Sequence, residues 1–408
     1  MIEVQEINSY GDLEIARSDW DALARRVNAS VFLSHGWFLA CAGVLEPSEG
    51  LKVLILRESG RVTGIAPMMT RKTTLRKLPL KQIGFLDNQL TPFCDFLFEE
   101  NESGVRTVIG YLLEQKQFDV LHFNRLLPSS SIFPVLKGEL ERQGLTVYEK
   151  AVGEVVYLRL TGDWDQFYNA KSRKFRMTRR SVANKISRLG QIQVECAEHP
   201  EQLQAALADL LELSAQGWKR QESRDLLGED VERRLLTALV EWGGREGMVR
   251  IWLLRKDKDV IAAEFHIVDG GTAYGLRAQY DPQYFSHSPG RALDYEIVER
   301  LFKAGLSTYD MGPGVAEYKR NWSDDTYPTV QIESFSRRLY PQLVAKAHYQ
   351  LAPAVKKTGL GKWLADRRGR TDEPKSPAAE KAQEGEKSDA TENEKAAEKE
   401  CPTVKSES

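Results

Sequence analysis

An acid, two turn glycines, a phenol and an amine stand close together in the stretch YDMGPGVAEYKRNW (309–322). Asp310 lies on a predicted strand, and Tyr318, Lys319 and Trp322 follow the Gly-Pro-Gly turn. Because ligands of α/β sheets bind outside the carboxyl ends of strands, these side chains are candidates for the rim of a site. Asp310 could orient a partner or act as a base. An exposed lysine and packed aromatic rings are the alternative, which the sequence leaves open.

A second candidate is the stretch SHSPGRALD (286–294), which leads into a predicted helix. Gly290 leaves the backbone N–H groups at the helix start unobstructed, and Arg291 adds a positive charge. Together with the positive end of the helix dipole they form a seat for phosphate. Pro289 fixes φ in the first turn, where its missing N–H costs nothing. Ser-Pro-Gly before a helix is also an ordinary cap.

The third candidate is the basic stretch KSRKFRMTRRSVANKISRLG (171–190), with eight Lys or Arg residues and no acid between Gln166 and Val194. Its apolar residues recur at helical spacing, which predicts an amphipathic helix ending at Gly190. The cationic face suits an anionic substrate, RNA or a lipid surface, and a solvated helix face is the alternative. The candidate substrate-binding residues here are Arg176, Arg179 and Arg180.

Other kinds of chemistry find little support. We find no G-x-S-x-G, no Walker loop, no Cys-His pair and no G-x-G-x-x-G behind a strand, which argues against covalent catalysis. The four cysteines (Cys41, Cys94, Cys196 and Cys401) and the six histidines are dispersed, so no metal site is expected. A phosphate seat with acids, a tyrosine and a lysine nearby favours direct group transfer from a phosphate-bearing donor.

The elements that must position these residues come in two similar series. The first series is a helix at 12–27, a helix at 34–45 capped by Ser34, a hairpin at 52–70, a helix near 106–115 and a strand at 118–123. The second series is a helix at 231–242, a hairpin at 249–255 and 260–268, a strand at 272–280, a helix at 291–305 and a strand at 307–311. A strand, a loop, a helix and a return strand predict a βαβ-like unit in a mixed sheet.

The two series also align with one another. The matched pairs are LRESGRVTGIA (56–66) with LRKDKDVIAAE (254–264), Gly104 with Gly290, and FDVLHF (118–123) with LSTYDM (306–311), at offsets of 198, 186 and 188. Three matches in the same order predict duplication of a hairpin–strand–helix–strand unit. The first copy of the helix loop, ENESGVR (100–106), is acidic and poorly suited to phosphate, so we expect only the second copy to be active.

These motifs together resemble the GNAT acyltransferase superfamily, and within it the CelD-like group of cellulose-biosynthesis acetyltransferases, relatives of the tandem FemAB-like proteins. The resemblance covers roughly residues 5–340 and includes FLSHGWFLA (32–40) and YDPQYFSHSPG (280–290). It implies an α/β fold of two tandem GNAT-like domains, each a mixed central sheet flanked by helices. The implied divisions are a non-catalytic domain at 1–160, a catalytic domain at 161–340, a helical extension at 341–370 and a tail at 371–408.

Charge separates the tail from the rest of the chain. Residues 371–408 carry eleven acidic and six basic side chains, a net charge of −5, and residues 1–370 carry a net charge of +3. The tail has almost no large apolar residue to bury, so it is predicted to be disordered. The remainder is only mildly basic, which disfavours a dedicated nucleic-acid binder.

The resemblance also implies site residues. Ser288, Pro289, Gly290 and Arg291 would contact acyl-CoA, and Lys319 would lie on the acceptor side. The fuller GNAT phosphate signature has more than one glycine before the helix, and this sequence has only Gly290 there. The FemAB-like branch uses aminoacyl-tRNA as the donor in place of acyl-CoA. The base is left open between Asp310, Gln279 and a water, with Tyr318 beside them and Glu264 and His266 as lesser candidates. Trp322 is a candidate for substrate binding.

The function implied is N- or O-acyl transfer from acyl-CoA, most simply acetyl-CoA, to a saccharide or other polar acceptor in envelope or exopolysaccharide biosynthesis. An aminoacyl-tRNA-dependent transferase and a degenerate GNAT pair serving as a scaffold are the alternatives. The first residues lack a signal-peptide pattern and no apolar run approaches a membrane span, so a cytoplasmic protein is expected. The expected partners are a small-molecule or saccharide acceptor and polysaccharide-biosynthesis proteins, with weak membrane-surface contact through residues 171–190.

Overall fold

The computed structural model describes residues 2–220 and 226–351, and the chain divides into two compact units, 1–344 and 345–408. The strands are β1 (Ile2–Ile7), β2 (Glu49–Glu58), β3 (Arg61–Leu75), β4 (Leu78–Phe85), β5 (Leu97–Phe98), β6 (Val120–Leu126), β7 (Val147–Arg159), β8 (Ile192–Ala197), β9 (Val249–Lys256), β10 (Asp259–Asp269), β11 (Thr272–Tyr280), β12 (Thr308–Pro313) and β13 (Thr326–Phe335).

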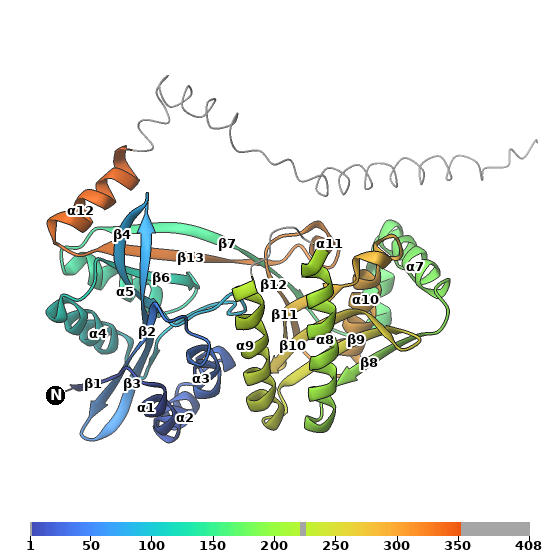
Figure 1. The fold of residues 1–408 in the computed structure, drawn as a ribbon, viewed down its shortest axis with the longest axis horizontal. Coiled ribbons are helices and arrows are strands. Elements are labelled where there is room, and N and C mark those ends of the chain that lie inside the picture. Colours follow the sequence, from blue (N-terminus) through green and yellow to red (C-terminus); the bar gives the residue numbers. More distant parts are fainter. Residues whose placement is uncertain (1, 221–225, 352–408) are drawn as a thin grey trace, which may run out of the picture. The chain divides into compact units, whose positions relative to one another are not determined.

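The helices occur singly or in groups between the strands along the chain (Figure 1). They are α1 (Tyr10–Ile15), α2 (Arg17–Arg26), η1 (Val31–Leu33), α3 (His35–Ala42), α4 (Asn101–Gln115), α5 (Ile132–Arg142), α6 (Trp164–Ala170), α7 (Arg173–Ser187), α8 (Pro200–Arg220), α9 (Leu226–Arg245), η2 (Pro282–His287), α10 (Pro289–Lys303), α11 (Glu317–Arg320), α12 (Leu339–Lys346) and η3 (Ala347–Leu351).

The described strands form one mixed sheet in the order β1-β2-β3-β4-β6-β13-β7-β12-β11-β10-β9-β8, and β5 pairs with β3. Within it, β1–β4 and β6 form a first half, and β8–β12 form a second half. Each half contains an antiparallel hairpin, a further strand, a helix and a parallel return strand, β6 beside β4 and β12 beside β11. The predicted fold class, α/β with two GNAT-like halves, is confirmed.

The repeated hairpin is confirmed at the level of the backbone. Ser59 and Gly60 turn from β2 to β3 with φ of 52° and 81°. Asp257, 198 residues after Ser59, turns from β9 to β10 with φ of 54°. Left-handed conformations suit glycine, aspartate and other short polar residues, so the two turns use the residues that this geometry favours.

The predicted correspondence of Gly104 with Gly290 is wrong. α4 begins at Asn101, so Gly104 lies inside the helix, whereas Gly290 is the second residue of α10. A Cβ on Gly104 would lie 2.5 Å from the ring of Phe98, so this glycine serves close packing of helix on strand. The two helices instead correspond at an offset of 188, the offset of β6 and β12.

Strands β7 and β13 join the two halves. β13 pairs antiparallel with β6 through Phe335 opposite Val120, and with the first part of β7. The last part of β7 pairs with β12, Leu158 lying opposite Tyr309. A strand that follows the second half in the sequence is therefore built into the sheet beside the first half. The predicted division at residues 160 and 161 falls directly after β7 and stays a prediction.

Three apolar cores cover the faces of the sheet. One core lies between the sheet and α4 and α5, around Phe123 and Leu136. A second lies between the sheet and α6, α7 and α10, around Leu293 and Ile297. The third contains residues of α1–α3 and of α8 and α9, so it is shared by both halves. There a Cβ on Gly36 would lie 2.1 Å from the indole of Trp242, which is why α3 and α9 pack so closely.

Some helix boundaries differ from expectation. The helix predicted at 12–27 is two helices, α1 and α2, which meet at Ala16. Ser34 caps α3 as predicted, its hydroxyl oxygen accepting a hydrogen bond from the amide of Trp37 at 3.3 Å. The basic helix ends at Ser187, and Gly190 takes a positive φ three residues later.

The predicted tail at 371–408 and residues 352–370 lie outside the described residues. Within residues 2–220 and 226–351, each helix is too short or too polar to cross a membrane.

Gly104→Ala and Gly110→Ala provide a matched pair of substitutions within α4. Alanine at 104 would clash with Phe98, and should lower the free energy of unfolding by about 1–3 kcal/mol. Alanine at 110, where nothing lies within 4 Å, should raise it by about 0.5–1 kcal/mol. Urea denaturation followed by circular dichroism measures both. Equal effects of the two substitutions would contradict the packing role of Gly104.

Candidate active site

The start of α10 presents free backbone donors. Ser288 caps the helix in the left-handed conformation, with φ of 55°, and Pro289 follows at the first position. The amides of Gly290 and Arg291 have no recorded partner among the described residues, as expected for the first turn of a helix. Arg291 lines a cavity beside this turn. The predicted residues Ser288, Pro289, Gly290 and Arg291 are therefore brought to one place.

The glycine at position 290 is not demanded by the backbone. Its φ is not positive, and a Cβ there would meet only Tyr280 at 3.7 Å, an ordinary contact. Ser288, rather than Gly290, takes the left-handed conformation that turns the chain into the helix. Gly290 keeps the amides of the first turn accessible.

Strands β11 and β12 separate beside this helix start. They pair only over Thr272–Tyr274 and Thr308–Asp310, where Tyr274 lies opposite Asp310. The backbones of Gly312 and Gly275 lie close together. A Cβ on Gly312 would be only 2.7 Å from the Gly275 carbonyl oxygen. Beyond that point the edge of β11 facing β12 has no partner strand among the described residues. An open strand edge can accept an extended chain by main-chain hydrogen bonds.

A small cavity lies between α7, α10 and the segment around α11. It is lined by Phe175, Thr178, Arg291, Asp294, Tyr295, Tyr318, Asn321 and Trp322, and its volume of about 20 Å³ suffices for about one water molecule. Arg291 from the stretch 286–294 lines this cavity together with Tyr318 and Trp322 from the stretch 309–322. The cavity is too small to hold a substrate.

Below the cavity lies a group of buried polar side chains, which we call the acid cluster: Glu264, His266, Asp294, Tyr309 and Lys319. Glu264 and Asp294 hydrogen-bond to each other, and the Tyr309 hydroxyl donates to Glu264 Oε2 at 3.4 Å. Burial raises the pKa of Glu264 to about 7. Burial, and then the charge of Glu264, raise the pKa of Asp294 well above its usual range. Two adjacent buried carboxyls favour sharing one proton.

His266 is a neutral member of the acid cluster. Burial lowers its pKa to about 3, so its contact with Glu264 is a hydrogen bond rather than an ion pair. The tautomer that fits carries hydrogen on Nε2, which donates to Glu264 Oε2 at 2.8 Å. Nδ1 is then an acceptor, and it has no hydrogen-bond partner among the described residues. Among those residues, no group of three His, Cys, Asp or Glu side chains could hold a metal ion.

Lys319 lies at the rim of the acid cluster and is buried, with only 7 % of its surface exposed. Its ammonium donates to the carbonyls of Gly312 at 2.9 Å and Pro313 at 2.8 Å. Burial lowers its pKa, and the nearby charges of Asp310, Asp294 and Glu264 oppose that shift. Lys319 therefore holds the end of β12 in place and supplies a positive charge to the carboxyls.

Asp310 belongs to the opposite face of the sheet. Neighbouring residues of a strand alternate in direction, and Tyr309 points into the acid cluster. Asp310 instead accepts hydrogen bonds from the Tyr327 hydroxyl at 2.5 Å and from the Gly312 amide at 2.8 Å. Burial raises its pKa. Both carboxylate oxygens thus have partners in a link between β12 and β13.

Gln279 is not brought together with the acid cluster either. On β11 it lies opposite Ala263, whose side chain belongs to the core shared with α8 and α9. Opposed residues of paired strands point to the same face, so Gln279 points away from Glu264, which is the next residue along β10. The predicted set Asp310, Tyr318, Lys319 and Gln279 is therefore divided between two faces.

The basic residues of α7 divide in a similar way. Arg179 forms an ion pair with Glu299 at 2.6 Å and stacks on the rings of Trp164 and Tyr168, each 4.9 Å away. Arg176 donates to the carbonyls of Asn169 and Lys171 at 2.7 and 2.6 Å. These two arginines support the fold around α6, α7 and α10. Arg180 is exposed.

Trp322 is 3 % exposed and packs its ring against Phe175 and Tyr295 at centroid distances of 5.2 and 5.1 Å. The carbonyl of Trp322 accepts a hydrogen bond from Lys171. It therefore closes one wall of the cavity rather than presenting a broad aromatic surface.

Asp294 is the site residue that the sequence alone did not single out. It follows the phosphate-seat turn by four residues and lies beside Leu293, on the buried side of α10. An acid on an otherwise apolar helix face is the signal that could have identified it.

The comparisons with known proteins agree with this arrangement. Residues 173–320 match the family model of the acetyltransferase (GNAT) domain. The match covers α7 through α11, and thus the acid cluster and the start of α10. No curated protein sequence matches the chain.

Solved structures extend the likeness of the fold to both halves. FemX is similar at a TM-score of 0.54 and 12 % identity, over 84 % of this chain and 99 % of that one. A conserved protein of unknown function from Bacteroides thetaiotaomicron VPI-5482 is similar at a TM-score of 0.52 and 12 % identity, over 82 % of this chain and 100 % of that one. At these identities the likeness concerns the fold alone.

Lys319→Met tests the structural role of the buried ammonium. The substitution leaves two carbonyls and the carboxyl pair without their cation, and should lower the free energy of unfolding by about 3–5 kcal/mol. Lys303→Met, which removes an exposed lysine of α10, should stay within about 0.5 kcal/mol of wild type. Urea denaturation of both variants gives the comparison. A loss below about 1 kcal/mol for Lys319→Met would contradict this role.

Proposed function

We propose that the protein is a GNAT-type acyltransferase that moves an acyl group from acyl-CoA to a hydroxyl or amine of a saccharide or similar polar acceptor. The observation that carries the proposal is the carboxyl pair Glu264–Asp294, buried directly below the free helix start of α10 within the domain matched to GNAT acetyltransferases. A titratable pair with perturbed pKa values beside free anion-binding donors is typical of a catalytic site.

The residues present fit a phosphate-bearing acyl donor. The amides of Gly290 and Arg291 have no partner within residues 2–220 and 226–351, the Arg291 side chain lies at the same turn, and the helix dipole adds positive potential. The unpaired edge of β11 fits an extended chain. The cavity itself is too small for a donor, so we place the donor along this edge and over the turn.

The carboxyl pair supplies the base. In acyl transfer the acceptor oxygen or nitrogen forms a bond to the thioester carbonyl carbon, its proton must leave, and the carbon–sulfur bond breaks to release a thiol. Asp294 lines the cavity, so the ionised form of the pair can take that proton, directly or through one water. The Glu264 pKa of about 7 places this acceptance near neutral pH. Lys319 and Tyr309 position the pair.

The finer assignments belong to the same proposal. An acetyl donor, membership of the CelD-like group and a role in polysaccharide biosynthesis are supported by the motifs at 32–40, 280–290 and 309–322. The exposed basic side chains of α7, Arg173, Lys174, Arg180 and Arg188, are available for an anionic part of a substrate or for a membrane surface.

Gly290→Glu tests donor binding. The new side chain has room, so the fold should be kept, and its carboxylate would occupy and repel the phosphate seat. Calorimetry with acetyl-CoA should show a Kd raised at least tenfold, about 1.4 kcal/mol, relative to wild type. Gly290→Ala is the control and should bind within about threefold of wild type.

Two outcomes would go against the donor assignment. Equal binding by wild type and Gly290→Glu would remove the seat from the proposal. Absence of binding by wild type, combined with a gel shift of labelled aminoacyl-tRNA that Arg180→Glu abolishes, would favour the aminoacyl-tRNA-dependent alternative.

The pH profile tests the base. Wild-type kcat/KM should rise with pH through about 7, because the pair must be ionised to accept a proton. Glu264→Gln and Asp294→Asn should each lower kcat/KM by about 10²–10⁴ and remove this limb. Glu296→Gln, another acid of α10, is the control and should leave rate and profile unchanged. An unchanged profile in both cluster variants would exclude the pair as the base.

The same raised pKa affects stability. Between pH 4.5 and about 7, folded Glu264 keeps a proton that the unfolded chain has released, so wild-type stability should fall as pH rises through this window. Glu264→Gln should show a shallower fall in urea denaturation at the same pH values. Parallel curves for the two proteins would contradict the raised pKa.

A further inference from the structure

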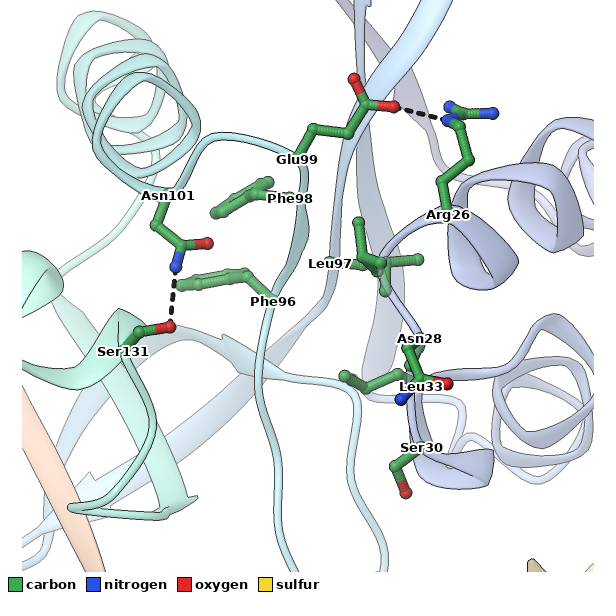
Figure 2. Close-up of a pocket in the computed structure, with 12 residues that line it drawn as sticks. Arg26, Asn28, Ser30, Leu33, Phe96, Leu97, Phe98, Glu99, Asn101 and Ser131 are labelled. Atoms are coloured by element: carbon green, nitrogen blue, oxygen red, sulfur yellow. Dashed lines mark hydrogen bonds and ion pairs between the residues drawn. The ribbon is translucent and has the colours of Figure 1, made fainter. Parts of the chain in front are cut away.

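A cavity much larger than the one beside α10 lies in the first half of the chain. Its volume is about 580 Å³, within the range of about 300–1,000 Å³ that is usual for small-molecule sites. Figure 2 shows its two walls, one from the end of α2 to η1 and the other from β5 to the start of α4. The reaction proposed above uses none of its residues.

The walls combine buried apolar residues with neutral polar groups. Leu33 of one wall, and Phe96 and Leu97 of the other, are almost fully buried; Phe96 and Leu97 point to opposite sides of their segment (Figure 2). Around them stand the carboxamides of Asn28 and Asn101. The carboxamide of Asn28 makes no recorded hydrogen bond within the described residues.

The hydroxyls of Ser30 and Ser131 complete this polar set. Asn101 donates to Ser131 Oγ at 2.8 Å, which fixes both groups at the rim (Figure 2). Side-chain amides and hydroxyls both donate and accept hydrogen bonds.

Two arginines engage Glu99, an acid of the cavity lining. Arg26 bonds to Glu99 at 2.5 Å and to the carbonyl of Val62 at 2.6 Å. Arg61 holds the same carboxylate in a two-bond fork, at 2.9 and 2.6 Å. Glu99 therefore has no free oxygen for a cationic ligand. The neighbouring Glu100 and Glu102 disfavour an anion at the start of α4.

We propose that this cavity binds an uncharged saccharide. The hydroxyls of a sugar can donate to and accept from the carboxamides and serine hydroxyls that line the cavity. The proposal concerns binding in the first half and stands whether or not the second half transfers an acyl group.

One wall of the cavity is connected to the second half. The Ser30 side chain hydrogen-bonds to Tyr274 of β11, whose register partner on β12 is Asp310. A saccharide bound beside Ser30 therefore lies one side-chain contact from the strands that separate near α10.

Ser131→Trp and Ser129→Trp form the test pair on the full chain. Tryptophan at 131 fills the cavity. Ser129 is exposed and lies outside the cavity lining, so Ser129→Trp is the control. The probes are cellotetraose, chitotetraose and maltotetraose, with UDP as an anionic comparator, measured by calorimetry and saturation-transfer NMR. At least one tetrasaccharide should bind wild type. Ser131→Trp should weaken that binding at least tenfold, and Ser129→Trp should leave it within twofold.

Other results overturn the proposal. Absence of binding by all three tetrasaccharides does so, as does equal weakening by both tryptophan variants, or UDP binding more tightly than any tetrasaccharide in a Ser131-dependent way. Gly290→Glu separates this site from the proposed acyltransferase site. It should leave saccharide binding unchanged while acetyl-CoA binding falls, so failure of one proposal is visible independently of the other.

Discussion

The burial of two carboxyls, Glu264 and Asp294, between β10 and α10 is the constraint on which the second half depends. Removing two ionised carboxylates from water costs far more than a fold of this size can offset, so the pair must share a proton or gain a cation. The structure supplies both, since the two carboxyls bond to each other and Lys319 lies near them. Tyr309 and neutral His266 complete the hydrogen bonds of Glu264. These hydrogen bonds and the nearby ammonium hold the two carboxyls in one geometry without a bound ligand.

The position of the carboxyl pair also explains the form of the surrounding chain. Lys319 can reach the pair only because Gly312 and Pro313 turn the end of β12 back toward α11, and its ammonium bonds to both of their carbonyls. Gly312 has φ of 74°, and its amide is held by Asp310 on the other face. The residues that the sequence places together at 309–322 therefore cooperate mainly in fixing a turn. That turn lets β11 and β12 separate beside the helix start.

The two halves share a fold and differ in chemistry. Both have a hairpin, a helix and a parallel return strand, yet the first half carries Glu100 and Glu102 at the start of α4 where the second carries Gly290 and Arg291 at the start of α10. The half with the acid cluster has a cavity large enough for one water, and the other half has a roomy neutral one. The charge at the helix start can differ between the halves without a change of fold, because the sheet tolerates changes in loops and helix ends.

Much of the fold could be read from the sequence, because it depends on short-range patterns. Alternating and helical spacing gave the hairpins at 52–70 and 249–268, and the helix of 291–305. The repeated turn at Ser59 and Asp257 follows from local backbone preferences alone. The amide donors at the start of α10 were predictable for the same reason, since a helix start is made by consecutive residues. β13 follows the second half in the sequence but pairs with β6 of the first half. This pairing joins residues far apart in the sequence, so no local pattern predicts it.

The catalytic candidates show the same limit. Asp310 and Gln279 were attractive because of their residue types, but one bulge and the alternation of strands put them on the face away from Glu264. The only sequence signal for Asp294 was an acid on an apolar helix face. Its partner Glu264 lies thirty residues earlier, on β10, so the sequence did not show that the two meet. By itself, the sequence determined the two hairpins, the helix that follows Pro289 and the amide donors at its start. The tertiary structure alone decided which acids meet, because contact between distant residues depends on strand register and on which face each side chain takes.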